Sequence, residues 1–385
     1  MELNFNQSAT LLAAITAQAT GRAALTATNA SEFVSVGTTA LSVGYDNLIG
    51  AISQVLSKTI FTTRPYTRKF KGLTATNIQY GNHVRKLSVV DDDPETNAEY
   101  NLTDGDSVDH YTVKKPKIVQ TNFYNAATYE RYITIYKHQL DVAFSNAAEF
   151  AAFISMVVQN VSDQIEQDHE TCSRFTLCNF IGGKIKGDTS NVIHLVTEYN
   201  AASGAQLTAA TVRKPENFVP FMKWAMARIR NVSQLMSERT QMFHVNIEGK
   251  PISRHTPVDK QRVYLLSSDV NMMESTVLSS VFHDEYLKKV DFEPVSFWQS
   301  VKNPDSINIT ASYMSANGDI TTAAVSQSNV FGVIFDQEAM GVTTVNTWTA
   351  HTPLNAKGGF SNVYWHFTDR YWNDFTENGV VLLLD

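Results

Sequence analysis

Apolar residues recur at helical spacing in two stretches near the beginning and middle of the chain. In residues 39–60 they share one face, which carries Leu41, Tyr45, Leu48, Ile49, Ile52, Leu56 and Ile60. Residues 216–238 repeat the pattern with Phe, Met, Ala, Ile and Val on one side. Both stretches are predicted to be amphipathic helices, and the first needs a partner surface for its apolar face.

A third helical stretch is much longer. Asn146 suits an N-cap, Glu149 suits its capping-box partner, and the apolar face continues to Gly182 and Gly183. The spacing predicts one helix over residues 146–181, roughly 50 Å long at 1.5 Å per residue. Such a helix must be packed against other elements along its length.

The remaining patterns predict strands. Residues 77–90 and 108–119 flank a long polar middle, which indicates a hairpin. Later strands are expected at 263–266, near Val295 and Ile307, and at 330–335, with a helix at 269–289. The end of the chain is predicted to form strands at 363–372 and 380–384, the last one buried. Residues 1–36 show little periodicity and suggest an arm that becomes ordered on another surface.

Charge is unevenly distributed along the predicted hairpin. Between Leu87 and Val113 there are eight acidic residues and no Lys or Arg, whereas Lys86 and Lys114 stand at the two ends. The hairpin either projects toward a basic patch on a neighbouring chain or is simply a solvated loop. The candidate inter-subunit contacts are Asp91, Asp92, Asp93, Glu95, Lys114, Lys115 and Lys117, together with Tyr45 and Ile52 on the apolar helix face.

Composition indicates an ordered protein rich in contact surface. Hydrophobic residues make up 43% and charged residues 18% of the 385 residues, and many polar positions are Ser, Thr or Asn, which lose water at an interface at lower cost than a charge. The net charge of −7 and the pI near 5.8 argue against tight, sequence-reading DNA binding. No apolar run is long enough for a membrane span. Cys172 and Cys178, six apart in a helix, cannot pair with each other.

No constellation for catalysis or metal binding emerges from the motifs. Residues 182–189 have the outline of a phosphate-binding loop, but Asp188 stands where the lysine is required. His169 and Glu170 open like a zinc-protease motif, but Ser173 replaces the second histidine. The acidic stretch lacks the spacing of a calcium loop. We therefore expect no enzyme activity, no metal and no cofactor; an intracellular hydrolase with an unfamiliar site is the remote alternative.

The order of parts, an arm with a helix, a polar hairpin, a very long helix, a second helix and a mixed region, resembles the Hong Kong 97-type capsid fold of tailed bacteriophages. Residues 265–270 (LLSSDV) look like the family's entry into the axial domain, and residues 331–340 (FGVIFDQEAM) look like its late strand and acidic-Ala segment. Residues 371–384 are similar to the family's C-termini. Residues 114–119 (KKPKIV) and Thr134-Ile135 resemble the capsid proteins of small short-tailed phages, the podophages.

This resemblance implies an α+β fold and a division of the chain into an N-terminal arm, an extended loop with its base, a peripheral domain containing the spine helix 146–181, an axial domain and a return to the peripheral sheet, at 1–70, 71–125, 126–240, 241–350 and 351–385. It implies a major capsid protein that self-assembles into hexamers and pentamers of an icosahedral or prolate head. A cross-linking lysine is absent between Leu87 and Val113, so the implied shell is non-covalent.

The same resemblance implies partners and a location. The chain would enclose double-stranded DNA without sequence-specific contacts, meet portal and scaffolding proteins, avoid membranes, and belong to the virion after assembly in the bacterial host cytoplasm. The alternative is an encapsulin-like nanocompartment shell of the same fold. Cargo-free, DNA-filled particles would distinguish the phage head.

Overall fold

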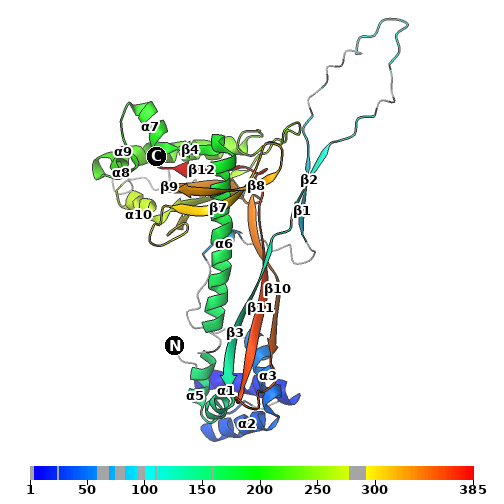
Figure 1. Ribbon diagram of the computed structural model, residues 1–385, viewed down its shortest axis with the longest axis vertical. Helices are drawn as coiled ribbons and strands as arrows, with labels where there is room; N and C mark the ends of the chain where they lie inside the picture. The colour runs from blue at the N-terminus through cyan, green and yellow to red at the C-terminus, as the bar shows by residue number, and fades with distance from the viewer. Residues whose placement is uncertain are drawn as a thin grey trace.

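The computed structural model describes residues 4–23, 26–58, 69–73, 83–92, 95, 97, 100–108, 111, 113–155, 157, 160–276 and 292–385. Within these residues the chain forms a head, a stalk and a foot, and a hairpin projects from beside the head (Figure 1). The stalk consists of one long helix, α6 (Asn160–Gly187), beside three long strands. This extended shape leaves much of the chain's surface open to other molecules.

The head is built on a five-stranded sheet in the order β4-β12-β9-β5-β6. Its strands are β4 (Val192–His194), β5 (Gln261–Leu266), β6 (Glu293–Val295), β9 (Val330–Asp336) and β12 (Gly379–Leu383). Every residue of β9 and β12 is buried, because both faces of the sheet are covered. One face packs on α7 (Leu195–Ser203), α8 (Ala209–Val212), α9 (Pro215–Ser237) and α10 (Ser267–Thr276), and the other on α6 and the ribbon β7 (Ile307–Met314) with β8 (Ile320–Gln327).

Alternation along β12 divides its side chains between two apolar cores. Val381 and Leu383 join the core formed with α6 and β7, whereas Val380 and Leu382 join the core formed with α9. The continuous apolar sequence at the C-terminal end of the chain is explained by this double burial. The predicted burial of the last strand is confirmed.

Two glycines allow β7 to approach α6 closely. A Cβ on Gly182 would lie 2.9 Å from the Cβ of Ala311, and one on Gly183 would lie 2.6 Å from the carbonyl oxygen of Ser312. The prediction that these glycines end the helix is wrong, since α6 continues to Gly187. They are sites of close packing inside the helix, so a helix can pass through a glycine pair when tertiary contacts need the space.

The stalk's sheet has the order β10-β11-β3, with all neighbours antiparallel. Its strands are β3 (Ala126–Tyr136), β10 (Met340–His351) and β11 (Phe360–Asn373). Helix α6 is joined to this sheet by polar pairs: His169 Nδ1 lies 2.6 Å from an Asp369 carboxylate oxygen, and the Arg131 guanidinium donates to Asp168 at 2.6 and 2.7 Å. These pairs brace the long helix, as its length required.

The foot consists of five helices at the far end of the stalk (Figure 1), α1 (Phe5–Thr20), α2 (Ala30–Ser42), α3 (Tyr45–Lys58), α4 (Lys137–Ala143) and α5 (Ala147–Ile154). They enclose a separate apolar core with the adjoining ends of β3 and β11. The N-terminal residues are therefore helical where no periodic element was expected. Their apolar stripe is built largely from Ala with Leu11, Leu12 and Ile15, and this pattern is weak in sequence.

Two predicted helices are divided. The helix predicted at 39–60 is two helices, since α2 ends at Ser42 and Gly44 adopts a φ of 101° before α3. The helix predicted at 146–181 appears as α5 and α6, with residues 156, 158 and 159 outside the described residues. The predicted helix at 269–289 is confirmed as far as Thr276, and its remainder also lies outside.

Strand pairing groups the later elements by sheet, and the predicted division into domains stays a prediction. Residues 192–237 were assigned to the unit of the long helix, but β4, α7, α8 and α9 pack in the head. Residues 351–385 were expected to return to the peripheral sheet. Within this range β11 pairs with β3 in the stalk, whereas β12 pairs with β4 and β9 in the head. Sequence order alone did not reveal that the chain crosses from stalk to head after Asn373.

Candidate functional site

The hairpin consists of β1 (Val84–Val89), β2 (Ile118–Phe123) and the residues between them. The strands pair antiparallel, with Val89 opposite Ile118 and Leu87 opposite Gln120. The second strand was predicted to begin at 108 but begins at Ile118. Leu87, Val89 and Ile118 point away from the head with exposed fractions of 59%, 64% and 58%. We call these three residues the hairpin apolar face.

The opposite face of β1 is fastened to the head by charged groups. The Lys86 ammonium lies 3.0 Å from Asp374 and also contacts Glu377, while the Arg254 guanidinium lies 3.2 Å from Glu377 and donates to the Ser88 hydroxyl at 2.8 Å. Burial raises the pKa of Glu377 above its ordinary value, although Lys86 and Arg254 oppose this. Burial lowers the pKa of Lys86, but the two carboxylates outweigh it and leave that pKa raised. The hairpin base is thus held by a compact network of opposite charges.

Asp91 makes a further attachment between the hairpin and the head. Its carboxylate accepts a hydrogen bond from the Ser253 backbone N–H and pairs with the Arg239 guanidinium. The hydrogen bonds from Ser253 keep the pKa of Asp91 below its ordinary value, and Arg239 lowers it further. Asp91, predicted to contact a neighbouring subunit, is therefore engaged within its own chain. Asp93 lies outside the described residues.

The acidic and basic ends of the hairpin also meet each other. The Lys114 ammonium lies 2.8 Å from both Asp92 and Glu95, and all three side chains remain largely exposed. The hydrogen bond from Lys114 lowers the pKa of Asp92. Lys115 and Lys117 are exposed. Lys114 therefore pairs with acidic residues of its own hairpin. An inter-subunit role for Asp92, Glu95, Lys114, Lys115 and Lys117 stays a prediction.

The two foot residues proposed as contacts are covered by the chain itself. Ile52 is 1% exposed within the foot core. The half-buried Tyr45 donates its hydroxyl to the Ile135 carbonyl at 2.8 Å, and burial raises the pKa of Tyr45 to about 12. The partner that this amphipathic helix needed is supplied by α1 and by the end of the stalk sheet. For Ile52 this corrects the predicted contact, because no side-chain surface is left for a neighbour.

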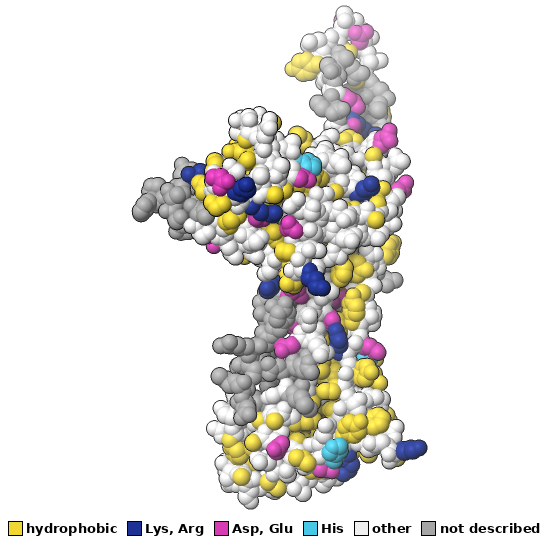
Figure 2. Space-filling view, turned by 60° about the vertical axis from the view of Figure 1, so that its left-hand side comes forward, with side chains coloured by type: hydrophobic (Ala, Val, Ile, Leu, Met, Phe, Trp, Pro, Cys, Tyr) yellow, Lys and Arg dark blue, Asp and Glu magenta, His cyan; other side chains and the backbone are white. Residues whose placement is uncertain are grey.

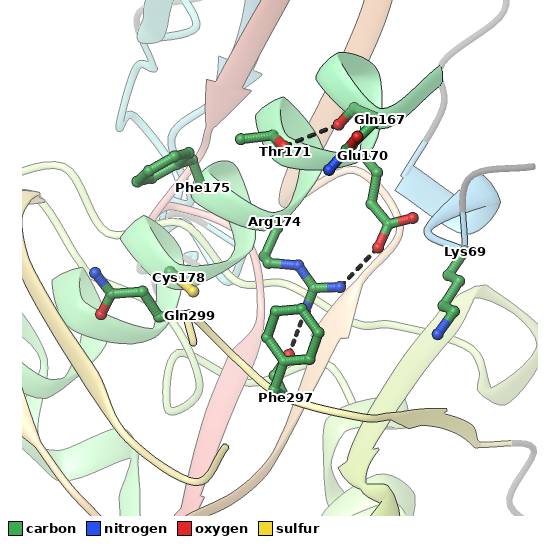
Figure 3. Close-up of a pocket in the computed structure, with 9 residues that line it drawn as sticks. All are labelled: Lys69, Gln167, Glu170, Thr171, Arg174, Phe175, Cys178, Phe297 and Gln299. Carbon is green, nitrogen blue, oxygen red and sulfur yellow. Dashed lines mark hydrogen bonds and ion pairs between the residues drawn. The ribbon is translucent and has the colours of Figure 1, made fainter. Parts of the chain in front are cut away.

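A pocket of about 250 Å³ opens beside α6 and contains no paired nucleophile and base (Figure 3). The Arg174 guanidinium donates to Glu170 at 2.7 Å and stacks 3.8 Å from the Phe297 ring centroid. Cys178, on its wall, is hydrogen-bonded to the Trp298 carbonyl, and burial raises its pKa to about 12, so the thiol stays protonated. These contacts are packing interactions, and they provide no activated nucleophile for catalysis.

The described residues also contain no cluster of three or more His, Cys, Asp or Glu side chains arranged to hold a metal ion. In the same part of the chain, no helix combines the length and apolar character that crossing a bilayer requires.

A second exposed surface, which the sequence did not reveal, runs along the stalk sheet. Aromatic rings line its outer face across all three strands, and we call the set Trp348, His366, Tyr364, Tyr132, Phe360 and Tyr136 the aromatic stripe. The Trp348 and His366 rings stack with centroids 4.0 Å apart, and the Tyr132 and Tyr364 rings lie 5.5 Å apart. Tyr132 is 61% and Trp348 52% exposed. Figure 2 shows hydrophobic side chains on the surface of the stalk between head and foot.

The aromatic stripe was not predicted from the sequence, because two of the three strands that carry it, β3 and β10, were not predicted as strands. Period-two alternation in β3 is present, since Tyr132 and Tyr136 alternate with the inward residues Ile133 and Ile135. That alternation was the available signal. Only strand register brings the three segments together.

One family model matches most of the chain, and solved structures share its fold. A family model described as Phi29-like phage major capsid protein matches residues 12–383. The chain is similar to a chain in the capsid structure of Staphylococcus phage Andhra, with a TM-score of 0.54, 10% identity and coverage of 85% of this chain and 87% of that one. It is also similar to a chain in the structure of head fiber and inner core protein gp22 of native bacteriophage P68, with a TM-score of 0.53, 9% identity and the same coverage. No curated protein matches the chain by sequence.

Proposed function

The chain belongs to the family of Phi29-like phage major capsid proteins and forms the shell of a phage head, and we propose that it does so as hexamers and pentamers in which each hairpin lies across a neighbouring subunit. The fold is the Hong Kong 97-type capsid fold, as the order of elements predicted. The protein is a structural component of the virion and not an enzyme. The family match favours a phage head over the nanocompartment alternative.

The projecting hairpin carries this proposal. A two-stranded ribbon is marginally stable in water by itself, and this one also exposes an apolar face. Exposed apolar surface on an extended element is typical of an interaction site. A neighbouring subunit supplies the missing cover, because a shell places the same surface of every subunit against another copy.

We further propose that the head serves as the axial domain, the stalk as the peripheral domain and the foot as the N-terminal arm together with α4 and α5. The five-stranded sheet with its helices is compact enough to gather around a capsomer axis, whereas the stalk presents a long flank for lateral contacts (Figure 1). The shell is held non-covalently, since Leu87 to Val113 contains no lysine for a cross-link.

The proposed partners follow from the same role. The assembled phage shell, icosahedral or prolate, encloses double-stranded DNA with few specific contacts, in keeping with the net charge of −7. Portal and scaffolding proteins contribute to assembly in the bacterial host cytoplasm, before the protein becomes part of the virion.

Assembly of the purified full chain tests the proposal. Light scattering and electron microscopy are expected to show closed particles with hexameric and pentameric units, and a denaturing gel without reductant should return only monomers. Exclusively monomeric protein in all conditions would contradict self-assembly, and a denaturant-resistant ladder would contradict the non-covalent shell.

A paired substitution then isolates the hairpin. Leu87→Ser with Val89→Ser should lower particle yield, because two of the three residues of the hairpin apolar face are lost while the chain's own core is intact. Met242→Ser with Val301→Ser is the matched control, since both side chains are exposed on the head. Equal yields from the two variants would remove the hairpin from the interface.

A further inference from the structure

The ribbon of β7 and β8 lies against α6 in the head (Figure 1), and its two edges differ. On the outer edge of β7, the Gln299 side chain accepts from the Asn308 backbone N–H at 2.5 Å and donates to the Asn308 carbonyl at 2.9 Å. The Asn179 side chain of α6 accepts from the Ser312 backbone N–H at 2.8 Å. Side-chain amides therefore take the place of a neighbouring strand along β7.

The same contacts show which backbone groups of β8 face outward. In an antiparallel pair, a residue whose N–H and C=O point away from the partner strand stands opposite a residue that does the same. Asn308 and Ser312 are such residues of β7, and the register places Ser326 and Thr322 opposite them. Outward groups recur at every second residue of β8, at Ile320, Thr322, Ala324 and Ser326.

This outer edge of β8 is open. Within the part of the chain that the structure describes, the four residues make no backbone hydrogen bond other than those of the ribbon, and their side chains are exposed. The strand (ITTAAVSQ) contains no charged residue and no proline, two devices that keep an exposed edge from pairing. It is eight residues long, whereas β4 and β6, the outer strands of the head sheet, have three residues each. An edge of this kind favours the addition of another strand.

The side chains of β8 suit a second copy of the same strand. A two-fold axis at Ala324 brings Thr322 of each chain opposite Ser326 of the other and leaves Ala324 opposite itself. The small side chain at the axis allows close approach, and pairs of hydroxyl side chains across antiparallel strands are favourable. Because β8 carries no charge, the two copies do not repel each other along the shared edge.

We propose that the β8 edges of two copies of this chain pair antiparallel about Ala324, so that two ribbons become one four-stranded sheet. A ribbon of two strands is marginally stable, and additional strands stabilise it. The contact forms in the soluble chain before it enters the shell, where it also covers an edge that favours aggregation.

This contact differs in symmetry from those of a capsomer. The same residues meet on both sides of the two-fold axis, so the contact is isologous and stops at two subunits. Rings of six or five subunits need heterologous contacts, in which two different surfaces of each subunit meet. The dimer is therefore a state of the chain beyond the hexamers and pentamers of the proposed function.

Disulfide trapping in the soluble full chain tests the register. Ala324→Cys places one thiol of each copy at the axis, where directly opposite Cα atoms of a hydrogen-bonded pair are about 5.5 Å apart, within reach of a disulfide. After mild oxidation, a denaturing gel without reductant should show a dimer band and nothing larger, because the native Cys172 and Cys178 are buried. Ala227→Cys, at an exposed alanine of α9 on the other side of the head sheet, is the matched control and should remain monomeric.

Charge substitution provides a second measurement that needs no oxidation. Ala324→Lys sets two ammonium groups against each other at the axis and should raise the dissociation constant of the dimer at least about tenfold in sedimentation experiments. Ala324→Glu should do the same. An equimolar mixture of the two variants should restore the dimer, because opposite charges then meet. The same two substitutions at Ala227 should leave the dissociation constant unchanged.

Three results would overturn the pairing of β8. They are a monomer in sedimentation of the unaltered soluble chain, a dimer band from Ala324→Cys that is absent or no stronger than that of the Ala227 control, and a mixture of the Lys and Glu variants that stays monomeric. Particle formation is measured separately by electron microscopy. Failure of the unaltered chain to form particles would overturn the proposed self-assembly and leave the result for the soluble dimer as it stands.

Discussion

The head and the hairpin are held in place by different forces. Strands β9 and β12 are buried on both faces by apolar side chains, so the head has one packing solution. The hairpin meets the head through Lys86, Arg254 and Asp91, whose pairs can be exchanged for water or for other partners. Apolar burial therefore fixes the structure of the head, whereas the polar attachment allows the position of the hairpin to change during assembly.

The largest expected effect comes from breaking the head. Phe335→Ala removes a ring that is completely buried against Phe180 and Tyr264. The cavity and the lost transfer free energy should lower the free energy of unfolding by about 3–5 kcal/mol. Denaturant unfolding followed by circular dichroism measures it. Tyr100→Ala, on the exposed hairpin, is the control, and an equal loss there would erase the distinction between the two regions.

A smaller effect is expected from removing a charge at the hairpin base. Lys86→Met leaves the buried Asp374 and Glu377 without their ammonium partner, and should cost about 2–3 kcal/mol of attachment. Limited proteolysis of the hairpin should accelerate while the unfolding midpoint of the head changes little. Glu377→Gln should be milder, because burial already raises the pKa of Glu377 and favours its neutral form. Equal sensitivity of both variants would contradict this account of the network.

Acidification is expected to loosen the attachment at Asp91. The pKa of this group is lowered in the folded chain, so its contribution is present above the ordinary value of 3.8 and is lost as pH falls through the lowered one. The buried Glu377 has the opposite sign, because its raised pKa favours the folded state more at low pH. Asp91→Asn separates the two groups. Its proteolysis rate should be faster at neutral pH and should rise less than that of the unaltered chain below pH 3.8.

The smallest effect is expected at the exposed end of the hairpin. Asp92→Asn breaks one of the two contacts of Lys114, and both side chains are more than half exposed. Solvent screening should keep the change in stability of the isolated chain too small to separate from that of the unaltered chain by denaturant unfolding. Comparing particle melting with subunit melting sharpens the result: a shift confined to particles would place Asp92 at a subunit contact, whereas no shift in either would favour a solvated loop.

The sequence predicted elements best where the local pattern matched the final packing. Helix α9 and strands β5, β9 and β11 were expected almost at their observed bounds, because their apolar periodicity is strong and each is buried where the pattern indicates. The charged ends of the hairpin were also visible. Their partners were not, because Arg239, Ser253 and Glu377 lie far from the hairpin in sequence.

Long-range pairing accounts for the remaining errors. Gly182 and Gly183 look like a helix end until β7 is known to lie against them. Ile52 looks like an interface residue until α1 covers it. The aromatic stripe depends on the register between three strands taken from residues 126–136, 340–351 and 360–373, and no short window of sequence contains that information.

The direct continuation of β2 into β3 gives the molecule a mechanical property. A pull on the hairpin travels along the axis of β3, all 11 residues of which are paired with β11. Ladder hydrogen bonds are perpendicular to the strands, so this load acts on the whole row in shear and cannot unzip it one bond at a time. Expansion of the phage shell would therefore load each subunit along its strands, the direction in which the β3–β11 ladder resists best.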